Sequence, residues 1–299
     1  MTPSETRPVL VLGAGGQVGE ATLAVLEHSG CPVVGLSHGQ VDIVDPVQVD
    51  SAVARIRPSV VINAAAFTAV DAAETDEAAA FAVNGAAAGV VARAARLHDA
   101  ALIHLSTDYV FDGEKGQPYV EGDVVNPLSI YGSSKLAGER AVLEAGGKGI
   151  LLRTSWLLGL RSGFVRAILN RAERGEPLQV VGDQWGRPTL VADLAQALAV
   201  LARSHPFVQG IGTYHYAGSA DANWFEIAQA LTALWSERTG RSPPSVRPVK
   251  SADWKAPARR PPDSRLDSTS MARDFGLSGR DWREGMPSLV DAWLKRESR

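Results

Sequence analysis

Short runs of apolar residues, many of them β-branched, alternate with alanine-rich stretches through the first half of the chain. Runs that are apolar throughout are typical of strands buried on both faces of a parallel sheet. Parallel strands need a crossover between them, and the alanine-rich stretches are long enough to be those helices. The predicted strands are Val9–Leu12, Val33–Leu36, Val60–Asn63, Leu102–Ser106 and Ile150–Arg153, and the predicted helices cover 18–28, 46–57, 76–98 and 133–144. We therefore predict an α/β fold with a doubly wound parallel sheet that binds ligands at the carboxyl ends of its strands.

The regular alternation stops after residue 155. Further helices are predicted at 164–174, 193–203, 224–238 and 287–295, together with a short apolar run at 178–181 and a run at 213–217 that can rejoin the sheet. A chain of 299 residues is long enough for one large domain and a smaller lobe. We therefore expect a first domain over 7–155, rejoined by about 188–220, and a lobe formed by 156–187 and 221–299.

A glycine-rich segment, Gly13-Ala-Gly-Gly-Gln-Val-Gly19, lies between the first predicted strand and the first predicted helix. Gly13 permits a tight turn, Gly16 lets backbone N–H groups approach a pyrophosphate, and Gly19 allows the helix to pack closely on the strand. The helix N-terminus then points unpaired N–H groups at the anion. The spacing is G-x-x-G-x-x-G, because Val18 stands where the older dinucleotide pattern has glycine. We predict a Rossmann-type dinucleotide-binding domain, with a ligand-free glycine turn as the alternative.

The choice of coenzyme depends on the end of the second predicted strand, which reads Leu36-Ser37-His38. The acidic residue that often binds the ribose 2′-hydroxyl of NAD is absent there, and no arginine replaces it. Ser37 and His38 could tolerate a 2′-phosphate, although His38 can equally be a surface loop residue. Asp42 and Ile43 could meet the adenine, with a simple turn as the alternative. We therefore expect NADPH or NADH as the coenzyme.

Tyr131 and Lys135 form a Y-x-x-x-K motif that follows Pro127 near the start of a predicted helix, so both side chains share one helix face. Thr107 stands at the carboxyl end of a predicted strand. Hydride transfer to a ketone builds negative charge on the carbonyl oxygen, which must then receive a proton. We expect Tyr131 to supply that proton, Lys135 to lower the pKa of Tyr131 and hold the nicotinamide ribose, and Thr107 to orient the carbonyl. The alternative is an ordinary exposed Tyr–Lys pair.

Charge and composition argue against several other classes of protein. The formal net charge is −3 with no basic stripe, which argues against a nucleic-acid groove. Cys31 is the sole cysteine, so the chain has no intrachain disulfide. The segment Met1–Pro8 is polar, and no stretch approaches the ~20 apolar residues of a membrane helix, so we expect a cytoplasmic protein. The histidines are scattered without ligand spacing, and we predict no metal site.

Taken in order along the chain, these motifs resemble those of the dTDP-4-dehydrorhamnose reductase family, within the extended short-chain dehydrogenases/reductases. The matching segments are Gly13–Gly19, Val61–Asp71, Ser106–Gly113, Pro127–Glu139, Arg153–Trp156, Asp183–Thr189, Gly212–His215 and Arg260–Leu266. The resemblance implies NAD(P)H-dependent reduction of the 4-keto group of dTDP-4-dehydro-L-rhamnose to dTDP-L-rhamnose. It also implies that the smaller lobe binds the dTDP-linked keto-deoxysugar.

The resemblance further implies roles for individual residues. The catalytic residues would be Thr107, Tyr131 and Lys135. For the cofactor it implies Gly13, Gly16, Gln17 and Val18 at the pyrophosphate and Ala64, Ala65 and Ala66 near the adenosine or ribose, with helix–sheet packing as the alternative for the alanines. The residues themselves add Gly19, Ser37, Asp42, Ile43, Tyr131 and Lys135 to the expected cofactor contacts. The substrate contacts would be Thr68, Asp108, Tyr109, Trp156, Gln184 and Arg260. Trp156 can stack on a sugar ring and Arg260 can meet a diphosphate, whereas a buried aromatic and a solvated charge are the alternatives.

Two features of the resemblance concern partners. Some family members join two chains through magnesium held by carboxylates, one just after the glycine loop and one in the second lobe. Ala21 and Ala192 stand at those positions here, so a homodimer is compatible with the sequence but a metal-bridged form is not expected.

Other functions on the same fold stay open. A reductase for another dTDP-linked deoxysugar would share these motifs. An epimerase or dehydratase would need a further acid/base group near Thr107, and Asp108 could serve. A non-catalytic regulatory subunit would bind dinucleotide without turnover, but such proteins often lack part of the triad that is complete here.

Overall fold

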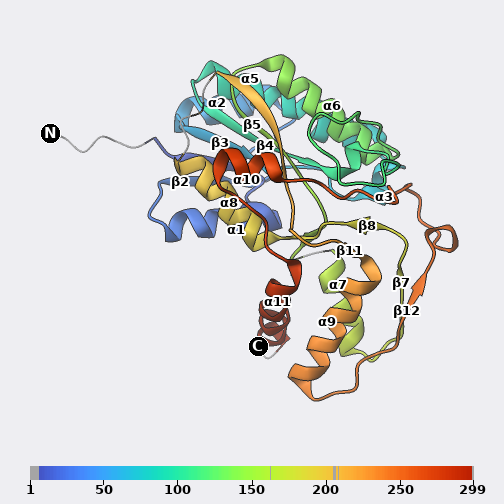
Figure 1. The fold of residues 1–299 in the computed structure, drawn as a ribbon. Coiled ribbons are helices and arrows are strands. Elements are labelled where there is room, and N and C mark those ends of the chain that lie inside the picture. The colour runs from blue at the N-terminus through green and yellow to red at the C-terminus, as the bar shows by residue number, and fades with distance from the viewer. Residues whose placement is uncertain (1–6, 162, 205–206, 208, 298–299) are drawn as a thin grey trace.

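Six parallel strands form the central sheet of the computed structural model, which describes residues 7–161, 163–204, 207 and 209–297 (Figure 1). Most of the polar segment Met1–Pro8 lies outside the described residues. The strand order is β10-β5-β4-β3-β1-β2, so the chain reverses direction across the sheet between β1 and β3. The strands are β1 (Val9–Leu12), β2 (Val33–Leu36), β3 (Val60–Asn63), β4 (Ala101–Thr107), β5 (Lys148–Thr154) and β10 (Gly210–Tyr216). The predicted doubly wound parallel sheet is confirmed, and the reversal is where such sheets bind ligands.

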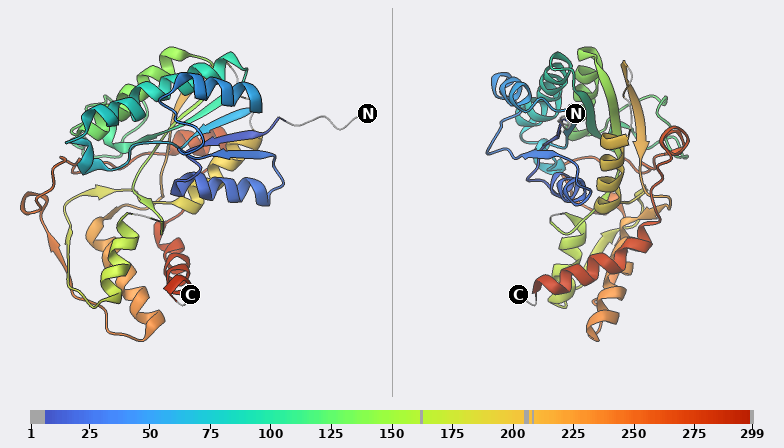
Figure 2. Two further views of the ribbon diagram at one scale, coloured as in Figure 1. Left: turned by 180° about the vertical axis from the view of Figure 1, so that it is seen from behind. Right: turned by 90° about the vertical axis from the view of Figure 1, so that its left-hand side faces the viewer.

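Helices cover both faces of this sheet (Figure 2). Leu10 and Leu12 of β1 point into a core shared with the helices of one face, whereas Val9 and Val11 point into the core of the other. This alternation follows from the period of two along a strand. The first face carries α2 (Pro46–Ile56), α5 (Ala87–Leu97) and α6 (Ile130–Ala145), and the second carries α1 (Gln17–His28) and α8 (Val191–Ser204).

The helix predicted at 76–98 is continuous but contains a wider turn. It consists of α4 (Glu77–Ala80), the π-helical segment η1 (Phe81–Ala86) and α5. The 21-residue stretch Glu77–Leu97 contains an 18-residue window with a mean hydropathy of 1.4, so by length and composition it could cross a membrane. The expectation that no stretch approaches this length was therefore wrong. Its apolar residues, such as Val91 and Ala95, are buried in the core between this helix and the sheet. This packing accounts for the apolar composition of the helix.

The C-terminal segments build a separate apolar core below the sheet (Figure 1). Trp235 and Trp282 are among its largest fully buried side chains. Its helices are α7 (Phe164–Glu173), α9 (Trp224–Thr239) and α11 (Trp282–Glu297), and its strand pairs are β7 (Leu178–Val181) with β12 (Val246–Val249), β6 (Leu157–Leu158) with β9 (Thr189–Leu190), and β8 (Trp185–Gly186) with β11 (Ala222–Asn223). Short elements α3 (Val70–Ala73), η2 (Asp108–Val110), η3 (Ser251–Asp253) and α10 (Thr269–Phe275) complete the chain.

Two boundaries differ from the sequence prediction. Helix α11 begins at Trp282 rather than at Pro287. The prediction placed the start at the proline, which is common in the first turn of a helix, but here the helix runs through it. Burial of Trp282 and Met286 holds the turn before the proline in place. Helix α6 begins at Ile130 rather than at 133, because Ser129 caps it by accepting a hydrogen bond from Gly132 N at 3.1 Å.

The close packing of α6 on the continuous helix Glu77–Leu97 can be tested by substitution of its glycines. A Cβ added to Gly138 would lie 2.0 Å from the backbone oxygen of Asn84, whereas one added to Gly85 would lie 3.4 Å from its nearest neighbour. We expect Gly138→Ala to lower the free energy of unfolding by about 1–3 kcal/mol through overpacking. Gly85→Ala is the matched control and should be neutral or stabilising by up to about 1 kcal/mol, since alanine favours helix. Urea denaturation of both variants measures this, and equal destabilisation would contradict the packing argument.

Candidate functional site

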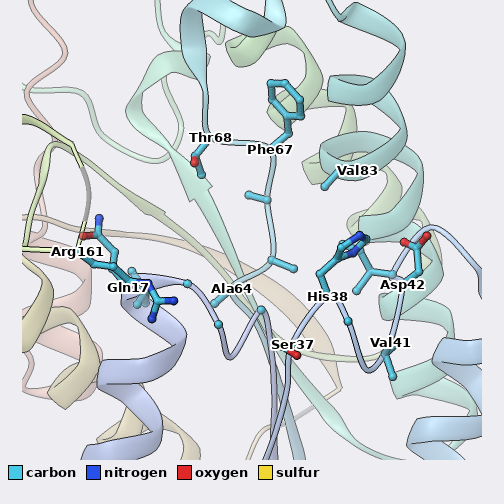
Figure 3. A pocket seen from close by; sticks show the side chains of 18 residues that line it. Gln17, Ser37, His38, Val41, Asp42, Ala64, Phe67, Thr68, Val83 and Arg161 are labelled. Atoms are coloured by element: carbon cyan, nitrogen blue, oxygen red, sulfur yellow. The ribbon is translucent and has the colours of Figure 1, made fainter.

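A cavity of about 750 Å³ opens at the carboxyl ends of β1, β2 and β3 (Figure 3). The glycine segment forms its floor. Gly13 has φ +77°, and a Cβ there would lie 2.6 Å from Ala65 N, so another residue would strain the turn and collide with the neighbouring loop. A Cβ at Gly19 would lie 2.3 Å from Gly13 O, so Gly19 allows α1 to pack against the turn.

Most of the predicted cofactor residues line this cavity. They are Gly13, Gly16, Gln17, Val18, Ser37, Asp42, Ile43, Ala64, Ala65 and Ala66. Gly19, Tyr131 and Lys135 are not among its lining residues. Thr68, which the resemblance assigned to the substrate, lines this cavity instead. The backbone N–H groups at the start of α1, where Gly16 is the N-cap, suit a pyrophosphate, and the small alanines leave room for a flat ligand.

Arg161 lines the same cavity and was not predicted (Figure 3). Figure 3 shows Gln17 and Arg161 on one side of the cavity, and His38 and Asp42 on the other. The Arg161 guanidinium forms an ion pair with Glu20 of α1, which lies 141 residues earlier in the chain. No local pattern could have predicted this placement, because it depends on the fold bringing two distant segments together.

The segment that follows β2 brings the Asp42 carboxylate to the wall of the cavity. Asp42 Oδ1 accepts a hydrogen bond from Val44 N at 3.0 Å, so that carboxylate stabilises its own turn. Ser37 N and Oγ both donate to Gln40 Oε1, at 2.9 and 2.8 Å. This corner therefore offers the Ser37 hydroxyl and the Asp42 carboxylate to the cavity.

Tyr131 lies in the first turn of α6, beside the segment that follows β4. A Cβ at Gly132 would lie 2.3 Å from Tyr109 O, so glycine allows this close approach, and the Tyr109 and Tyr131 rings meet edge to face with centroids 5.7 Å apart. Burial raises the pKa of Tyr131 to about 12, a hydrogen bond with Thr107 opposes the rise, and the charge of Asp108 adds to it. Tyr131 is therefore protonated at neutral pH, as a proton donor must be.

The expectation that Lys135 lowers the pKa of Tyr131 is not supported. The Lys135 ammonium is buried and donates to the Leu105 carbonyl oxygen at 2.6 Å, and it is not among the groups that shift the tyrosine pKa. Burial lowers the pKa of Lys135 itself to about 8, while the neighbouring Glu139 carboxylate opposes that shift. The sequence placed both side chains on one helix face but could not show which carbonyl the lysine binds.

A buried ion pair lies beneath these residues. Arg153 of β5 donates from Nε and Nη2 to the two oxygens of Glu139, at 2.9 and 2.7 Å, and both side chains are less than a tenth exposed. Ser106 of β4 donates to the same carboxylate at 2.5 Å. Since Glu139 lies one turn after Lys135 on α6, this network fixes the helix against the ends of two strands.

Thr107 and Asp108 meet at the carboxyl end of β4. Thr107 Oγ1 donates to Asp108 Oδ1 at 3.1 Å and accepts from Tyr109 N at 3.2 Å. Ser264 Oγ donates to Asp108 Oδ2 at 2.5 Å. Burial raises the pKa of Asp108 to about 7, and its hydrogen bonds oppose the rise. The predicted triad residues Thr107, Tyr131 and Lys135 thus gather from β4 and α6.

The remaining predicted substrate residues divide between two settings. Gln184 and Arg260 line a second cavity, of about 550 Å³, which is formed within the C-terminal segments by α7, β7 and the start of α9. Arg260 is not a solvated charge, because it pairs with Asp71 at 2.9 Å. Trp156 is buried and stacks on Trp224 with centroids 3.8 Å apart, so the ring that reaches this cavity is Trp224.

Residues of the second cavity that were not predicted include Arg171, Trp224 and Trp254. Trp254 lies in the Pro- and Arg-rich stretch for which the sequence suggested no function. Its ring is 48% exposed, but a single exposed apolar residue is common on protein surfaces, so only the folded arrangement brings it to the cavity.

Within the part of the chain that the structure describes, no group of three or more His, Cys, Asp or Glu side chains could hold a metal ion. Ala21 and Ala192 both line a third cavity, of about 490 Å³, together with Glu20 and Arg280. Arg280 is engaged by Asp193, with the shortest contact at 2.5 Å.

Comparison with known families matches residues 7–294 to the family described as RmlD substrate binding domain. The chain belongs to this RmlD family. A dTDP-4-dehydrorhamnose reductase of Burkholderia thailandensis is 40% identical over 92% of this chain and 95% of its own length. A probable dTDP-4,6-dihydroxy-2-methyloxan-3-one 4-ketoreductase of Streptomyces antibioticus is 41% identical over 95% of this chain and 96% of its own. The family resemblance inferred from the sequence is confirmed.

A solved structure gives the same result for the RmlD fold. The dTDP-4-dehydrorhamnose reductase of Bacillus anthracis, solved in complex with NADP, superimposes with a TM-score of 0.88 at 33% identity, covering 96% of this chain and 99% of that one. The match extends over both the sheet and the C-terminal helices.

The buried pair in this RmlD-family chain provides the second test. We expect Glu139→Gln to lower the free energy of unfolding by about 3–5 kcal/mol, because it leaves the Arg153 charge buried without its partner. Glu176→Gln is the matched control: it removes the carboxylate of an exposed pair with Arg174, and should cost less than about 1 kcal/mol. Chemical denaturation measures both, and similar small losses would show that the buried pair adds little.

Proposed function

We propose that this chain is an NAD(P)H-dependent reductase that converts the 4-keto group of dTDP-4-dehydro-L-rhamnose to the hydroxyl of dTDP-L-rhamnose. The names of its relatives support the substrate class, since the Burkholderia protein is a dTDP-4-dehydrorhamnose reductase. The observation that carries the proposal is the meeting of Thr107, Tyr131 and Lys135 at the end of β4 and the start of α6, in the sheet whose strands β1, β2 and β3 carry the glycine-lined cavity at their carboxyl ends.

The residues at the cavity fit a nicotinamide coenzyme. The turn at Gly13 and the N–H groups beginning at Gly16 would hold the pyrophosphate, and the small side chains Ala64–Ala66 would lie along the adenosine and ribose. Ser37 would face the adenine ribose, and Lys135 would hold the nicotinamide ribose. When bound, the reduced coenzyme supplies the hydride that the carbonyl carbon accepts. The relative from Bacillus anthracis was solved with NADP, which supports the same use here.

The side chains of this chain account for the proton. Tyr131 donates its phenolic proton to the C4 oxygen as that oxygen gains charge, which completes the new hydroxyl. Thr107 donates a hydrogen bond to the same oxygen and fixes its angle to Tyr131. Lys135 donates to the Leu105 carbonyl beside the Glu139 carboxylate, and we expect it to act on the nicotinamide ribose rather than on the charge of Tyr131. Thr107 and Lys135 are buried and Tyr131 is half-buried, so partial exclusion of water strengthens these interactions.

We further propose that the chain divides into a coenzyme-binding domain and a substrate-binding lobe. The domain comprises 7–155 and about 188–220, which includes α8 and β10, and the lobe comprises 156–187 and 221–299. The grouping of apolar side chains into separate cores supports this division. Arg260 and Gln184 would contact the nucleotide diphosphate sugar in the second cavity, with Trp224 providing an aromatic surface.

A second candidate keeps the chemistry and changes the sugar. The Streptomyces antibioticus relative is a probable 4-ketoreductase for a different dTDP-linked sugar, and it is as similar to this chain as the Burkholderia reductase. A non-catalytic role is disfavoured, because Thr107, Tyr131 and Lys135 are all present and gather at one place. We place the protein in the cytoplasm, without nucleic-acid or membrane partners, and we expect any homodimer to form without a bridging metal at Ala21 and Ala192.

The defining measurement is the loss of reduced-nicotinamide absorbance when the purified protein meets dTDP-4-dehydrorhamnose made in situ. Oxidation of NADPH or NADH with formation of dTDP-L-rhamnose is the expected result, and the two rates give the coenzyme preference. Oxidation only with another dTDP-linked 4-keto sugar would transfer the assignment to the second candidate. Coenzyme binding without oxidation of any keto-sugar would favour the regulatory role.

Tyr131→Phe tests the proton donor. We expect turnover to fall by roughly 10²–10⁴-fold, the usual range for losing a general acid, with coenzyme affinity nearly unchanged. Tyr214→Phe is the matched control, because its hydroxyl bonds Asp274 away from the site, and it should retain wild-type turnover. Steady-state rates measure turnover, and fluorescence titration measures coenzyme affinity. An equal loss of turnover and affinity would show that Tyr131 is not the proton donor.

A further inference from the structure

The carboxyl of Asp108 connects the catalytic strand to the C-terminal lobe. It lies directly after Thr107 and is 2% exposed. Its Oδ1 accepts from the Thr107 hydroxyl at 3.1 Å, and its Oδ2 accepts from the Ser264 hydroxyl at 2.5 Å. Ser264 comes from a segment 156 residues later, so this buried carboxyl is where the two parts of the molecule touch beside the reacting groups.

The direction of the Thr107 hydroxyl creates a conflict with its catalytic task. Its one proton is given to Asp108, while Tyr109 N donates to its oxygen. A hydroxyl has a single proton, so a Thr107 that donates to the carboxylate cannot also donate to a substrate carbonyl. Reduction requires the hydroxyl to be released from that carboxylate or the carboxylate to become neutral.

The surrounding hydrogen bonds determine where a proton on Asp108 would lie. Ser264 is 1% exposed, and within the described residues its hydroxyl donates to Oδ2 and to no other acceptor. Since a buried hydroxyl keeps its acceptor, Oδ2 continues to accept and the added proton belongs on Oδ1. Thr107 also shares a hydrogen bond with the Tyr131 hydroxyl, which turns to the substrate oxygen when substrate binds. Oδ1–H then donates to Thr107 Oγ1, whose two lone pairs are filled by Asp108 and Tyr109 N. The Thr107 proton is thereby free for the substrate oxygen.

We propose that Asp108 is a positioning residue that, in its neutral form, turns the Thr107 hydroxyl toward the 4-keto oxygen of the substrate. This inference rests on the proposed reductase function and adds a requirement to it. The carboxyl does not touch the reacting atoms; it acts through Thr107. The Ser264 hydroxyl from the lobe selects the oxygen that carries the proton, so the position of the lobe and the direction of the catalytic hydroxyl are linked.

The groups facing Asp108 come from each element packed against it. Tyr131 faces it from α6, Tyr109 from η2, and the indole of Trp156 donates to it from the segment after β5. Arg260 lies beyond Tyr109, from the same segment as Ser264, and is already paired with Asp71. Burial dominates, and it raises the pKa of Asp108 to about 7. A raised pKa means that the neutral form prevails below about 7 and is lost as pH rises.

The first experiment is the pH dependence of kcat at saturating coenzyme and substrate, in the wild-type protein and in Asp108→Asn. Wild-type kcat should fall about tenfold per pH unit above the Asp108 pKa, because the competent neutral form is lost. In the variant, the amide oxygen can accept from Ser264 while the amide N–H₂ donates to Thr107, which reproduces the neutral carboxyl at every pH. We expect the variant to keep low-pH turnover within a few-fold and to lose the fall near neutrality.

Lys135 also titrates near this range, since its pKa is about 8, and it would leave a separate fall at higher pH in both proteins. Ser264→Ala distinguishes the two groups. The Ser264 hydrogen bond lowers the pKa of Asp108, so its removal should move the fall in kcat to higher pH. A substitution that only destabilised the fold would not shift the midpoint of the fall in kcat to higher pH.

A second measurement does not depend on turnover. The infrared C=O stretch of a protonated carboxyl, taken as the difference between wild type and Asp108→Asn, should decrease through the same pH range as wild-type kcat. Failure to find reductase activity at any pH would overturn the proposed function, while this titration would still report on Asp108. An active wild type whose pH fall is unchanged in Asp108→Asn would overturn the inference, as would a folded variant inactive at all pH. If Asp108→Asn does not fold, the shift of the kcat profile in Ser264→Ala and the infrared titration of the wild-type protein test the inference instead.

Discussion

The buried ion pair between Glu139 and Arg153 is the interaction on which the site depends. It joins helix α6 to strand β5, and Ser106 adds strand β4 to the same carboxylate. Burying two charges is costly, and the cost is offset only where hydrogen bonds are well formed on both sides. Here Arg153 makes two bonds to Glu139 and its guanidinium lies 5.1 Å from the centre of the Phe111 ring. The proton donor, the lysine and the threonine therefore keep their relative positions although they come from different elements.

The sheet could be predicted from the sequence because its strands are buried on both faces and lack polar interruptions. The predicted strands at 9–12, 33–36 and 60–63 agree with the structure residue for residue. The C-terminal region was harder, because its elements are short and pair across long distances. Strand β12 contains Pro248 and lies in a Pro- and Arg-rich stretch, which has a low propensity for strand. It pairs with β7 nevertheless, because tertiary packing outweighs the local propensity.

The site was predictable in part for a similar reason. The glycine segment and the small side chains after β3 could be identified from the sequence. Their roles depend on backbone conformation and on the lack of a large side chain, and both follow from residue type. Arg161, Trp224 and Trp254 could not, since their positions depend on how the C-terminal segments fold back. The pKa of Tyr131 was misjudged because motif spacing shows proximity along a helix but not the extent of burial or the partner that Lys135 selects.

The order of the elements along the chain has a consequence for biosynthesis. Five strands of the sheet lie before residue 155, but α8 and β10 follow only after the first part of the lobe, residues 156–187, has been made. Leu194 and Leu198 of α8 pack against the same core as Val9 and Val11 of β1. As the nascent chain leaves the ribosome, part of this apolar face stays open to solvent until α8 arrives, and exposed faces of this kind promote aggregation. The interval between the emergence of β5 and that of α8 is therefore when this polypeptide is most prone to aggregate.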